Sequence, residues 1–320
     1  MIQIIDPLNA KILQDLLKDG RKTFTQIAKD CNTSKDVVTK RYKQMKNTGI
    51  IVGATVHNSP ACYGANFVAG IYLKIKPNTE KQVLELVHKI PQFLYTYNIG
   101  IHPGLAALLI MKNIEELEEI KKLIKKMPHI LGSEIIVLLG IRTSPENLSI
   151  LSSQDDPIEK DKIVIRKRKT KIDRIDTEII EKLAINGRAT FKEISKELKV
   201  STDTISKRYA KLKQNGDIKA VIQIDPTKIG YSAFALFNLA FSDENSPNHV
   251  LELAKIPDVN FVIKTSGNFD FTVSLMICNT QQLIAVQEQI SRMPGLIDMQ
   301  MTLGRLFNVW PLPREFTSTF

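Results

Sequence analysis

The basic side chains of this sequence are concentrated in three short segments. The 320 residues include 44 Lys and Arg against 34 Asp and Glu, a formal net charge of +10. Residues 34–46 carry +4, residues 201–213 carry +3 and residues 160–171 carry +6, so the rest of the chain is slightly acidic. Clustered Lys and Arg attract polyanions because they replace the counterions condensed on phosphates. This pattern predicts nucleic acid or an anionic membrane surface as a partner.

Two of these segments have the form of a basic helix that follows a turn, which is how a helix docks in the major groove of double-stranded DNA. Lys and Arg reach guanine edges and phosphates, while Ser and Thr reach phosphates or bases. The alternative is a solvated helix face. We favour DNA because the charge is duplicated, follows the turn and has few acids beside it. The side chains expected to face DNA are Ser34, Lys35, Thr39, Lys40, Arg41, Lys43, Lys46, Ser201, Thr202, Ser206, Lys207, Arg208, Lys211 and Lys213.

Other reactive chemistry has little support in the sequence. None of the five histidines lies at metal-ligand spacing from another His, Cys or carboxylate, and no phosphate-binding glycine loop or nucleophile elbow is present. The three cysteines are too far apart for a disulfide framework or a zinc knuckle. We therefore expect no catalytic residue, metal or cofactor. The lack of a long apolar run and of a secretory signal predicts a soluble cytoplasmic protein without membrane contact.

The elements that would position these side chains occur twice. A shift of 167 residues aligns Asp6–Ile51 with Asp173–Ile218, and 17 of these 46 positions are identical. Weaker likeness continues beyond them, for example between Pro60 and Pro226 at an offset of 166. A period of this length is too long for a solenoid. It indicates a tandem duplication of a two-part unit.

The first part of each unit is predicted to be a winged helix-turn-helix domain. In the first copy, a capped start at Asp6-Pro7 opens one helix, which stops at Gly20. A short second helix and a turn follow, and Ser34 or Ser201 then caps a third helix that runs to Gly49 or Gly216. The alternating segments 50–57 and 218–224 suit a two-stranded wing.

The second part of each unit alternates strand and helix in the order βαββαβ, which is the ferredoxin-like arrangement. The fold class is therefore α+β, with two winged helix-turn-helix domains alternating with two ferredoxin-like domains. A polar segment with a basic end separates the units, and we expect it to be an exposed linker. The expected boundaries are residues 1–57, 58–141, 142–171 (linker), 172–225 and 226–320.

The helical segments resemble the feast/famine regulators, also called the Lrp/AsnC family. Residues 173–188 carry the pattern D-x-x-D-x-x-I-I-x-x-L-x-x-N-G-R. The first copy is looser, since Asn9 replaces the second Asp, although Asp19-Gly20-Arg21 is kept. The resemblance implies a sequence-specific transcription regulator that senses a small, amino-acid-like effector. Members pair their sensing modules, so one fused chain is expected to act as a pseudo-dimer, and self-association beyond that is left open.

The resemblance also implies where the effector binds. Members carry a glycine turn between the second and third strands of the sensing module, and here it places Ser266, Gly267, Asn268 and Asp270 at the ligand. A plain hairpin turn is the alternative. The first copy lacks the Asp and has His102 and Pro103 instead, which indicates that the two halves have specialised. Two further functions stay open: a ligand-binding or interaction protein that has lost DNA binding, and a haem-pathway decarboxylase of similar layout.

Overall fold

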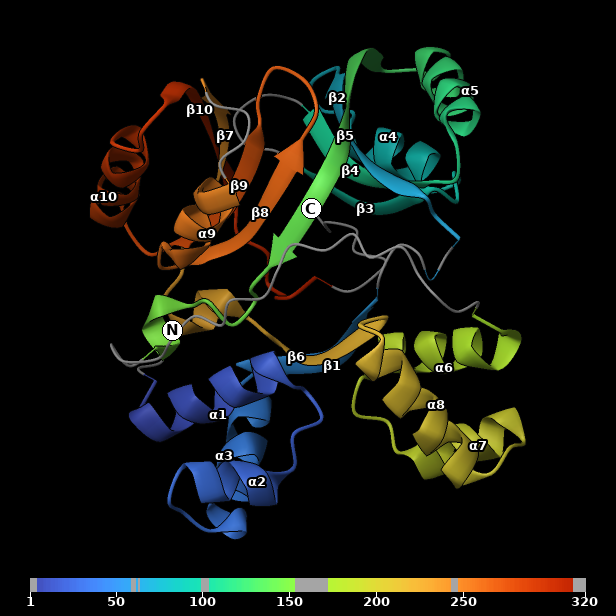
Figure 1. Ribbon diagram of the computed structural model, residues 1–320, viewed down its shortest axis with the longest axis vertical. Helices are drawn as coiled ribbons and strands as arrows, with labels where there is room; N and C mark the ends of the chain where they lie inside the picture. Colours follow the sequence, from blue (N-terminus) through green and yellow to red (C-terminus); the bar gives the residue numbers. More distant parts are fainter. Residues whose placement is uncertain are drawn as a thin grey trace.

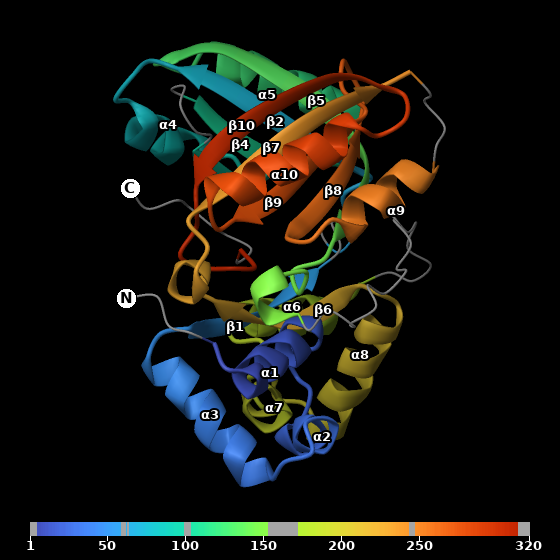
Figure 2. The same ribbon diagram turned by 90° about the vertical axis from the view of Figure 1, so that its left-hand side faces the viewer.

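The computed structural model describes residues 5–58, 62, 64–98, 104–152, 172–242 and 247–312. It has a helical part with two three-helix domains side by side and a sheet part above them (Figure 1). Figure 2 shows the same division from the side, with a two-stranded ribbon between the two parts. The same order of elements occurs once in each half of the chain, which confirms the α+β fold class. No helix among these residues is long and apolar enough to cross a bilayer.

Each helical domain has three helices whose starts are capped by side chains. Asp6, Thr23 and Ser34 each accept a hydrogen bond from a backbone amide in the first turn of the helix that follows. Such caps satisfy amides that have no partner inside the helix. The bounds are α1 Pro7–Lys18, α2 Phe24–Asp30 and α3 Lys35–Asn47 in the first copy, and α6 Arg174–Ile185, α7 Phe191–Leu198 and α8 Thr202–Gln214 in the second.

The strand that follows each helical domain pairs with its counterpart from the other copy. β1 (Ile51–Asn58) and β6 (Ile218–Ile224) form one antiparallel two-stranded sheet, in which Thr55 faces Val221. The predicted two-stranded wing is therefore shared between the copies, with one strand from each. Each first helix packs on the strand of the other copy, α1 on β6 and α6 on β1. This exchange joins the two helical domains through their backbones.

The two βαββαβ domains follow the predicted order closely. The first contains β2 Phe67–Ile75, α4 Glu80–Val87, β3 Phe93–Asn98, β4 Gly104–Met111, α5 Ile114–Lys125 and β5 Ile130–Thr143. A short 3-10 helix, η3 (Pro226–Ile229), precedes the second domain. The second contains β7 Ala233–Phe241, α9 Pro247–Lys255, β8 Val259–Thr265, β9 Phe271–Ile277, α10 Thr280–Ser291 and β10 Leu296–Arg305.

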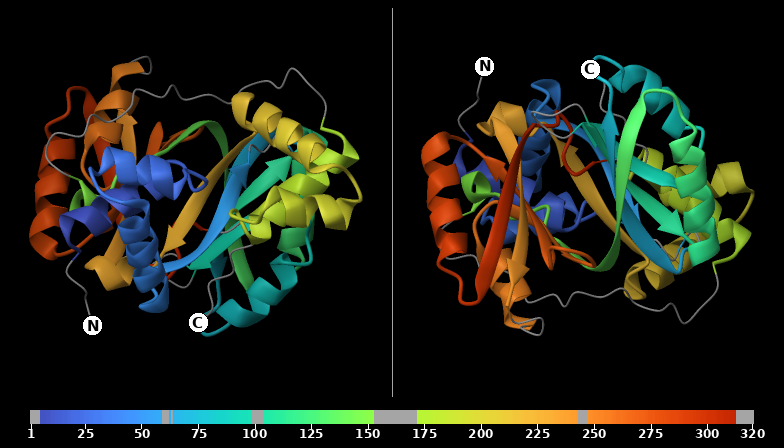
Figure 3. Two further views of the ribbon diagram at one scale, coloured as in Figure 1. Left: turned by 90° about the horizontal axis from the view of Figure 1, so that it is seen from below. Right: turned by 90° about the horizontal axis from the view of Figure 1, so that it is seen from above.

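The two domains join into one eight-stranded sheet with the order β10-β7-β9-β8-β5-β2-β4-β3. The long strand β5 makes the junction, since residues up to Leu138 pair with β2 and residues from Leu138 to Thr143 pair with β8. The sheet bends there, and its halves curve toward one another with the helices outside (Figure 3). Val68, Leu138 and Ile263 form a small apolar cluster at this junction. The two βαββαβ domains thus pair within one chain.

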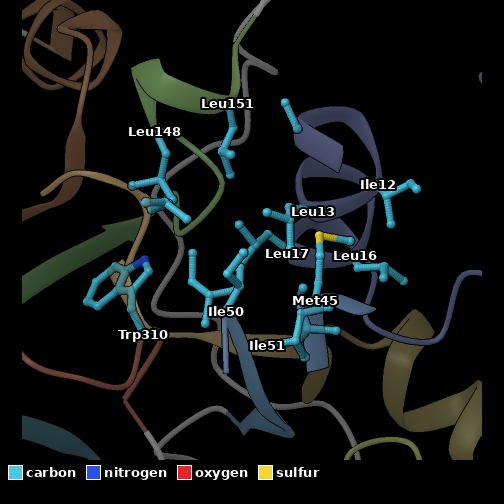
Figure 4. Packing of buried hydrophobic residues seen from close by; sticks show 14 of the residues in the cluster. Ile12, Leu13, Leu16, Leu17, Met45, Ile50, Ile51, Leu148, Leu151 and Trp310 are labelled. Carbon is cyan, nitrogen blue, oxygen red and sulfur yellow. The ribbon is translucent and has the colours of Figure 1, made fainter. Parts of the chain in front are cut away.

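The start of the expected linker is mostly buried or half-buried, so its prediction as an exposed segment is wrong for most of residues 142–152. β5 continues to Thr143, and a 3-10 helix, η2 (Ser149–Leu151), follows. Leu148 and Leu151 are 0% and 3% exposed and pack with α1, Ile50 and Trp310 (Figure 4). Apolar burial outweighs the polar composition of this segment. The basic run 160–171 lies outside the described residues.

Candidate nucleic-acid interface

Helix α3 buries one face and presents lysines on the other. Val38 and Met45 are 0% and 1% exposed and hold the helix in the domain core. The opposite side carries four predicted DNA-facing lysines, which are exposed and form no ion pair within the described part of the chain: Lys35, Lys40, Lys43 and Lys46. Thr39 is half-buried, and its hydroxyl donates to the Lys35 carbonyl at 2.8 Å. Helix α3 therefore offers uncompensated positive charge to solvent.

Helix α8 also buries one face and presents lysines on the other, but more of its positive charge is paired with carboxylates. Ile205, Tyr209 and Leu212 are buried, while the lysines lie outside. Lys207 lies 2.8 Å from an Asp203 carboxylate oxygen on the same helix, and Lys213 lies 2.7 Å from an Asp19 carboxylate oxygen in the other copy. Lys211 is exposed and forms no such pair among the described residues. The two helices are thus unequal in free charge.

The predicted hydroxyl contacts are mostly used within the domains. Ser34 and Ser201 are the N-caps of α3 and α8, as expected from the sequence, and both are exposed. The Thr202 hydroxyl lies 3.1 Å from the Ser195 hydroxyl on α7, and Ser206 is half-buried. Ser34, Ser201 and Thr202 thus lie at the start of α3 or α8, directly after the turn.

Arg41 and Arg208 lie in internal ion pairs. The Arg41 guanidinium donates to the carboxylate of Asp6, the N-cap of α1. In the second copy, Arg208 donates to Asp173 and Asp176 at 2.6 and 2.9 Å. These hydrogen bonds raise the pKa of Arg208 above the usual value for arginine. Each arginine therefore fastens the third helix to the start of the first helix. The sequence predicted Asp6 as a helix cap, but it did not predict the pairing of these aspartates with the arginines.

The glycine turn of the second βαββαβ domain is hydrogen-bonded into the sheet. The Ser266 hydroxyl accepts a hydrogen bond from the Val137 amide of β5 at 3.0 Å, and the Ser266 amide donates back to the Val137 carbonyl. The Asp270 carboxylate accepts from the Phe241 amide at 2.7 Å. Gly267 has φ +122°, a conformation that side-chain-bearing residues avoid. Of the four predicted effector contacts, Gly267 and Asn268 are the exposed ones.

The corresponding segment of the first copy, including His102, lies outside the described residues.

A buried polar cluster in the second βαββαβ domain was not expected from the sequence. Asp258 is 0% exposed and its carboxylate accepts hydrogen bonds from the Ser149 amide and hydroxyl at 2.7 and 2.6 Å. Tyr231 and Gln282 donate to the same carboxylate. Burial raises the pKa of Asp258, and the hydrogen bonds oppose that rise. The cluster anchors η2 to the sheet domain. Among the described residues, no group of His, Cys, Asp and Glu could hold a metal ion.

Sequence comparisons place this arrangement among known regulators. Residues 172–213 match the model of the AsnC-type helix-turn-helix domain, and residues 5–52 match a winged helix-turn-helix DNA-binding model. The HTH-type transcriptional regulator FL11 of Pyrococcus horikoshii is 32% identical over 126 residues, which are 39% of this chain and 83% of FL11. The chain belongs to the Lrp/AsnC family of transcription regulators. Another relative, LrpA of the same organism, is 29% identical over 120 residues, or 37% of this chain and 83% of LrpA.

A solved structure also resembles the whole two-copy arrangement of this Lrp/AsnC family member. The siroheme decarboxylase NirDL has a TM-score of 0.60 and 15% identity, and the match covers 93% of this chain and 91% of that one. NirDL has also been solved in complex with an iron-uroporphyrin III analogue, and that structure gives a TM-score of 0.58 at 16% identity. Likeness at this identity establishes a shared fold and carries no activity across.

Proposed function

We propose that this chain binds double-stranded DNA as a sequence-specific transcription regulator, with both recognition helices supplied by one chain. The observation that carries the proposal is the free lysine face of α3, which Lys35, Lys40, Lys43 and Lys46 form. A helix that follows a turn and presents cations fits the major groove and neutralises phosphates on both sides of it. The membership of the Lrp/AsnC family supports the same conclusion.

The unequal charge of α3 and α8 refines this proposal. Lys207 and Lys213 must leave their aspartate partners before they can contact phosphates, whereas the lysines of α3 need not. The α3 domain therefore makes the stronger contact. The preferred operator is an imperfect palindrome with half-sites about one helical turn, or a multiple of it, apart.

We further propose that the second sensing module binds a small amino-acid-like effector at its glycine turn. The Ser266 hydroxyl and the Asp270 carboxylate already have hydrogen-bond partners in the sheet, so their role is to shape the turn. Asn268 and the backbone of Gly267 are exposed, and they are the groups that can contact a ligand. This division of roles supports effector sensing in the second module.

Genome-wide occupancy of the tagged full-length chain in its own cells tests the proposed function. The expected result is a set of discrete sites that share a bipartite motif, with occupancy lost in a K40Q/K43Q/K46Q variant of equal abundance. Occupancy indistinguishable between the two proteins would contradict it and favour an interaction protein that has lost DNA binding. An absorbance titration with an iron uroporphyrin addresses the decarboxylase alternative. A saturable spectral shift at one equivalent per chain would favour that enzyme function.

A further inference from the structure

Two glycines allow the helical domains to approach across the shared ribbon. The Gly20 amide, at the end of α1, donates to the Ala220 carbonyl in the other copy at 2.8 Å, and the Gly187 amide donates to the Ala54 carbonyl at 2.8 Å. A Cβ atom added at Gly20 would lie 2.6 Å from the backbone of Val221. One added at Gly187 would lie 2.5 Å from the backbone of the facing strand. Any larger residue would separate the domains.

The arginines that follow these glycines cross into the opposite domain. Arg21 donates through Nη1 to the carbonyls of Gly187 and Ala189, both at 2.9 Å. Arg188 donates through Nη1 to the Gly20 carbonyl. The contacts are reciprocal, and they bring together the two copies of the Gly-Arg motif that the sequence pattern contains.

Each of these two guanidinium groups also stacks on aromatic rings of the opposite helical domain. Arg21 lies 5.2 Å from the ring of Tyr209, on α8, and Arg188 lies 5.5 Å from the ring of Tyr42, on α3. Phe191 and Phe24, from the second helix of each domain, complete the two platforms at 4.5 and 5.0 Å. A planar guanidinium combines such stacking with directional donation, which an ammonium group does not. Each arginine therefore touches the recognition helix of the other copy.

The shared two-stranded ribbon alone does not fix the relative orientation of the two helical domains. A sheet of only two strands twists readily, and such a ribbon varies more in twist than a larger sheet does. Helices α3 and α8 extend away from this ribbon, so a small change in its twist moves both helices (Figure 2). The reciprocal arginines oppose that motion because they add hydrogen bonds between the two domains beyond the strand pairing of the ribbon.

We infer that Arg21 and Arg188 form a reciprocal clasp that fixes the separation and rotational phase of α3 and α8, so that the spacing of two DNA half-sites becomes a determinant of specificity. This inference rests on the proposed DNA-binding function for its DNA consequence. Its mechanical consequence, a fixed distance between the two helices, holds without DNA. Bivalent binding is lost when geometry forbids both contacts at once, and that loss weakens binding by about 100-fold or more.

A spin-label distance measurement tests the mechanical consequence in the full chain without DNA. Labels on cysteines placed at Asn47 and Gln214, with the native cysteines replaced, report the distance between α3 and α8. The expected result is a narrow distribution that broadens in R21Q/R188Q and stays narrow in R292Q/R305Q, which loses the same charge from the second sensing module. Melting curves and circular dichroism check that each variant is folded. R21K/R188K keeps the charge without the planar guanidinium, and it tests whether charge alone keeps the distance distribution narrow. An unchanged distribution in R21Q/R188Q overturns the clasp, whatever happens with DNA.

Duplexes with half-sites at the preferred spacing, or with about 5 bp (half a helical turn) inserted, test the DNA consequence. The wild-type chain is expected to lose about 100-fold in affinity on insertion. R21Q/R188Q is expected to bind both duplexes within a few-fold of each other and a single half-site as wild type does. Equal discrimination by both proteins would overturn the role in spacing. Absence of wild-type binding to any duplex would instead refute the proposed function, while the distance measurement still decides the clasp.

Discussion

Neutralising the free lysines of α3 should change how DNA binding depends on salt. In K40Q/K43Q/K46Q the three exposed side chains keep much of their length and lose their charge. Each phosphate neutralised by a protein contributes about −0.9 to the slope of log K against log [salt]. If all three lysines contact phosphates, the slope becomes shallower by about 2.7. When the salt is raised from 50 to 200 mM, the factor by which DNA affinity falls is therefore about 40 times smaller for the variant than for the wild type.

Fluorescence anisotropy with a labelled duplex, repeated across this salt range, measures the slope. The matched control is K121Q/K122Q/K125Q on α5 of the first sensing module, which removes the same charge far from the recognition helices. A further variant, K207Q/K211Q/K213Q on α8, should reduce the slope by less, because two of its lysines lie in ion pairs with aspartates. A slope unchanged in the α3 variant, or reduced as much in the α5 control, would refute the assignment of the lysine face.

The same structure predicts the effects of four other substitutions. D270A should lower the unfolding free energy by about 1–3 kcal/mol, because it leaves a buried backbone amide without its acceptor, and should keep any shift in melting temperature that an amino acid produces. N268A should keep the stability and lose that shift, so thermal scans of both proteins with a panel of amino acids check the two roles. G20A should cost about 1–3 kcal/mol in chemical denaturation because its Cβ would strike the facing strand, whereas G132A, with no atom within 4 Å of the added Cβ, should match the wild type. The pKa of His57 is lowered to about 4 by burial and a neighbouring lysine, so the stability it confers is present above pH 6.5 and is lost as the pH falls toward 4. H57Q should remove about 3 kcal/mol of that pH dependence, which urea titrations at several pH values would detect.

Local pattern was enough to predict most of the elements. The expected βαββαβ order is the order that the structure shows in both copies. Alternating apolar residues and clear breakers define such segments without knowledge of the rest of the chain. The repeat then transferred each assignment to the other copy, which made the βαββαβ order visible twice.

Long-range partners could not be read in the same way. An alternating segment predicts a strand, but it does not say which strand it pairs with, so the exchange of β1 and β6 was missed. The ion pairs of Arg41 and Arg208 could not be predicted, because their aspartate partners lie more than 30 residues away in the sequence. The buried carboxylate of Asp258 had no local signal at all, since its donors come from three distant segments.

Burial within the expected linker had a signal that its polar neighbours masked. Leu148 and Leu151 are spaced by three residues, which suits one side of a helical turn, but the segment is too short for its periodicity to stand out. Its packing depends on a surface formed jointly by α1, β6 and the C-terminal segment around Trp310. Such a composite surface exists only in the folded chain.

DNA binding by both helical domains at once can be tested by hydroxyl-radical footprinting. The full chain is bound to a duplex selected from a random pool. If both recognition helices engage one DNA molecule, two protected segments appear on the same face of the duplex, separated by about one helical turn or a multiple of it. The protection nearest α3 should be stronger, and K40Q/K43Q/K46Q should lose it first. DNA binding through the two helical domains of one chain would be contradicted if no sequence were enriched. It would also be contradicted by a single protected segment that the variant leaves unchanged.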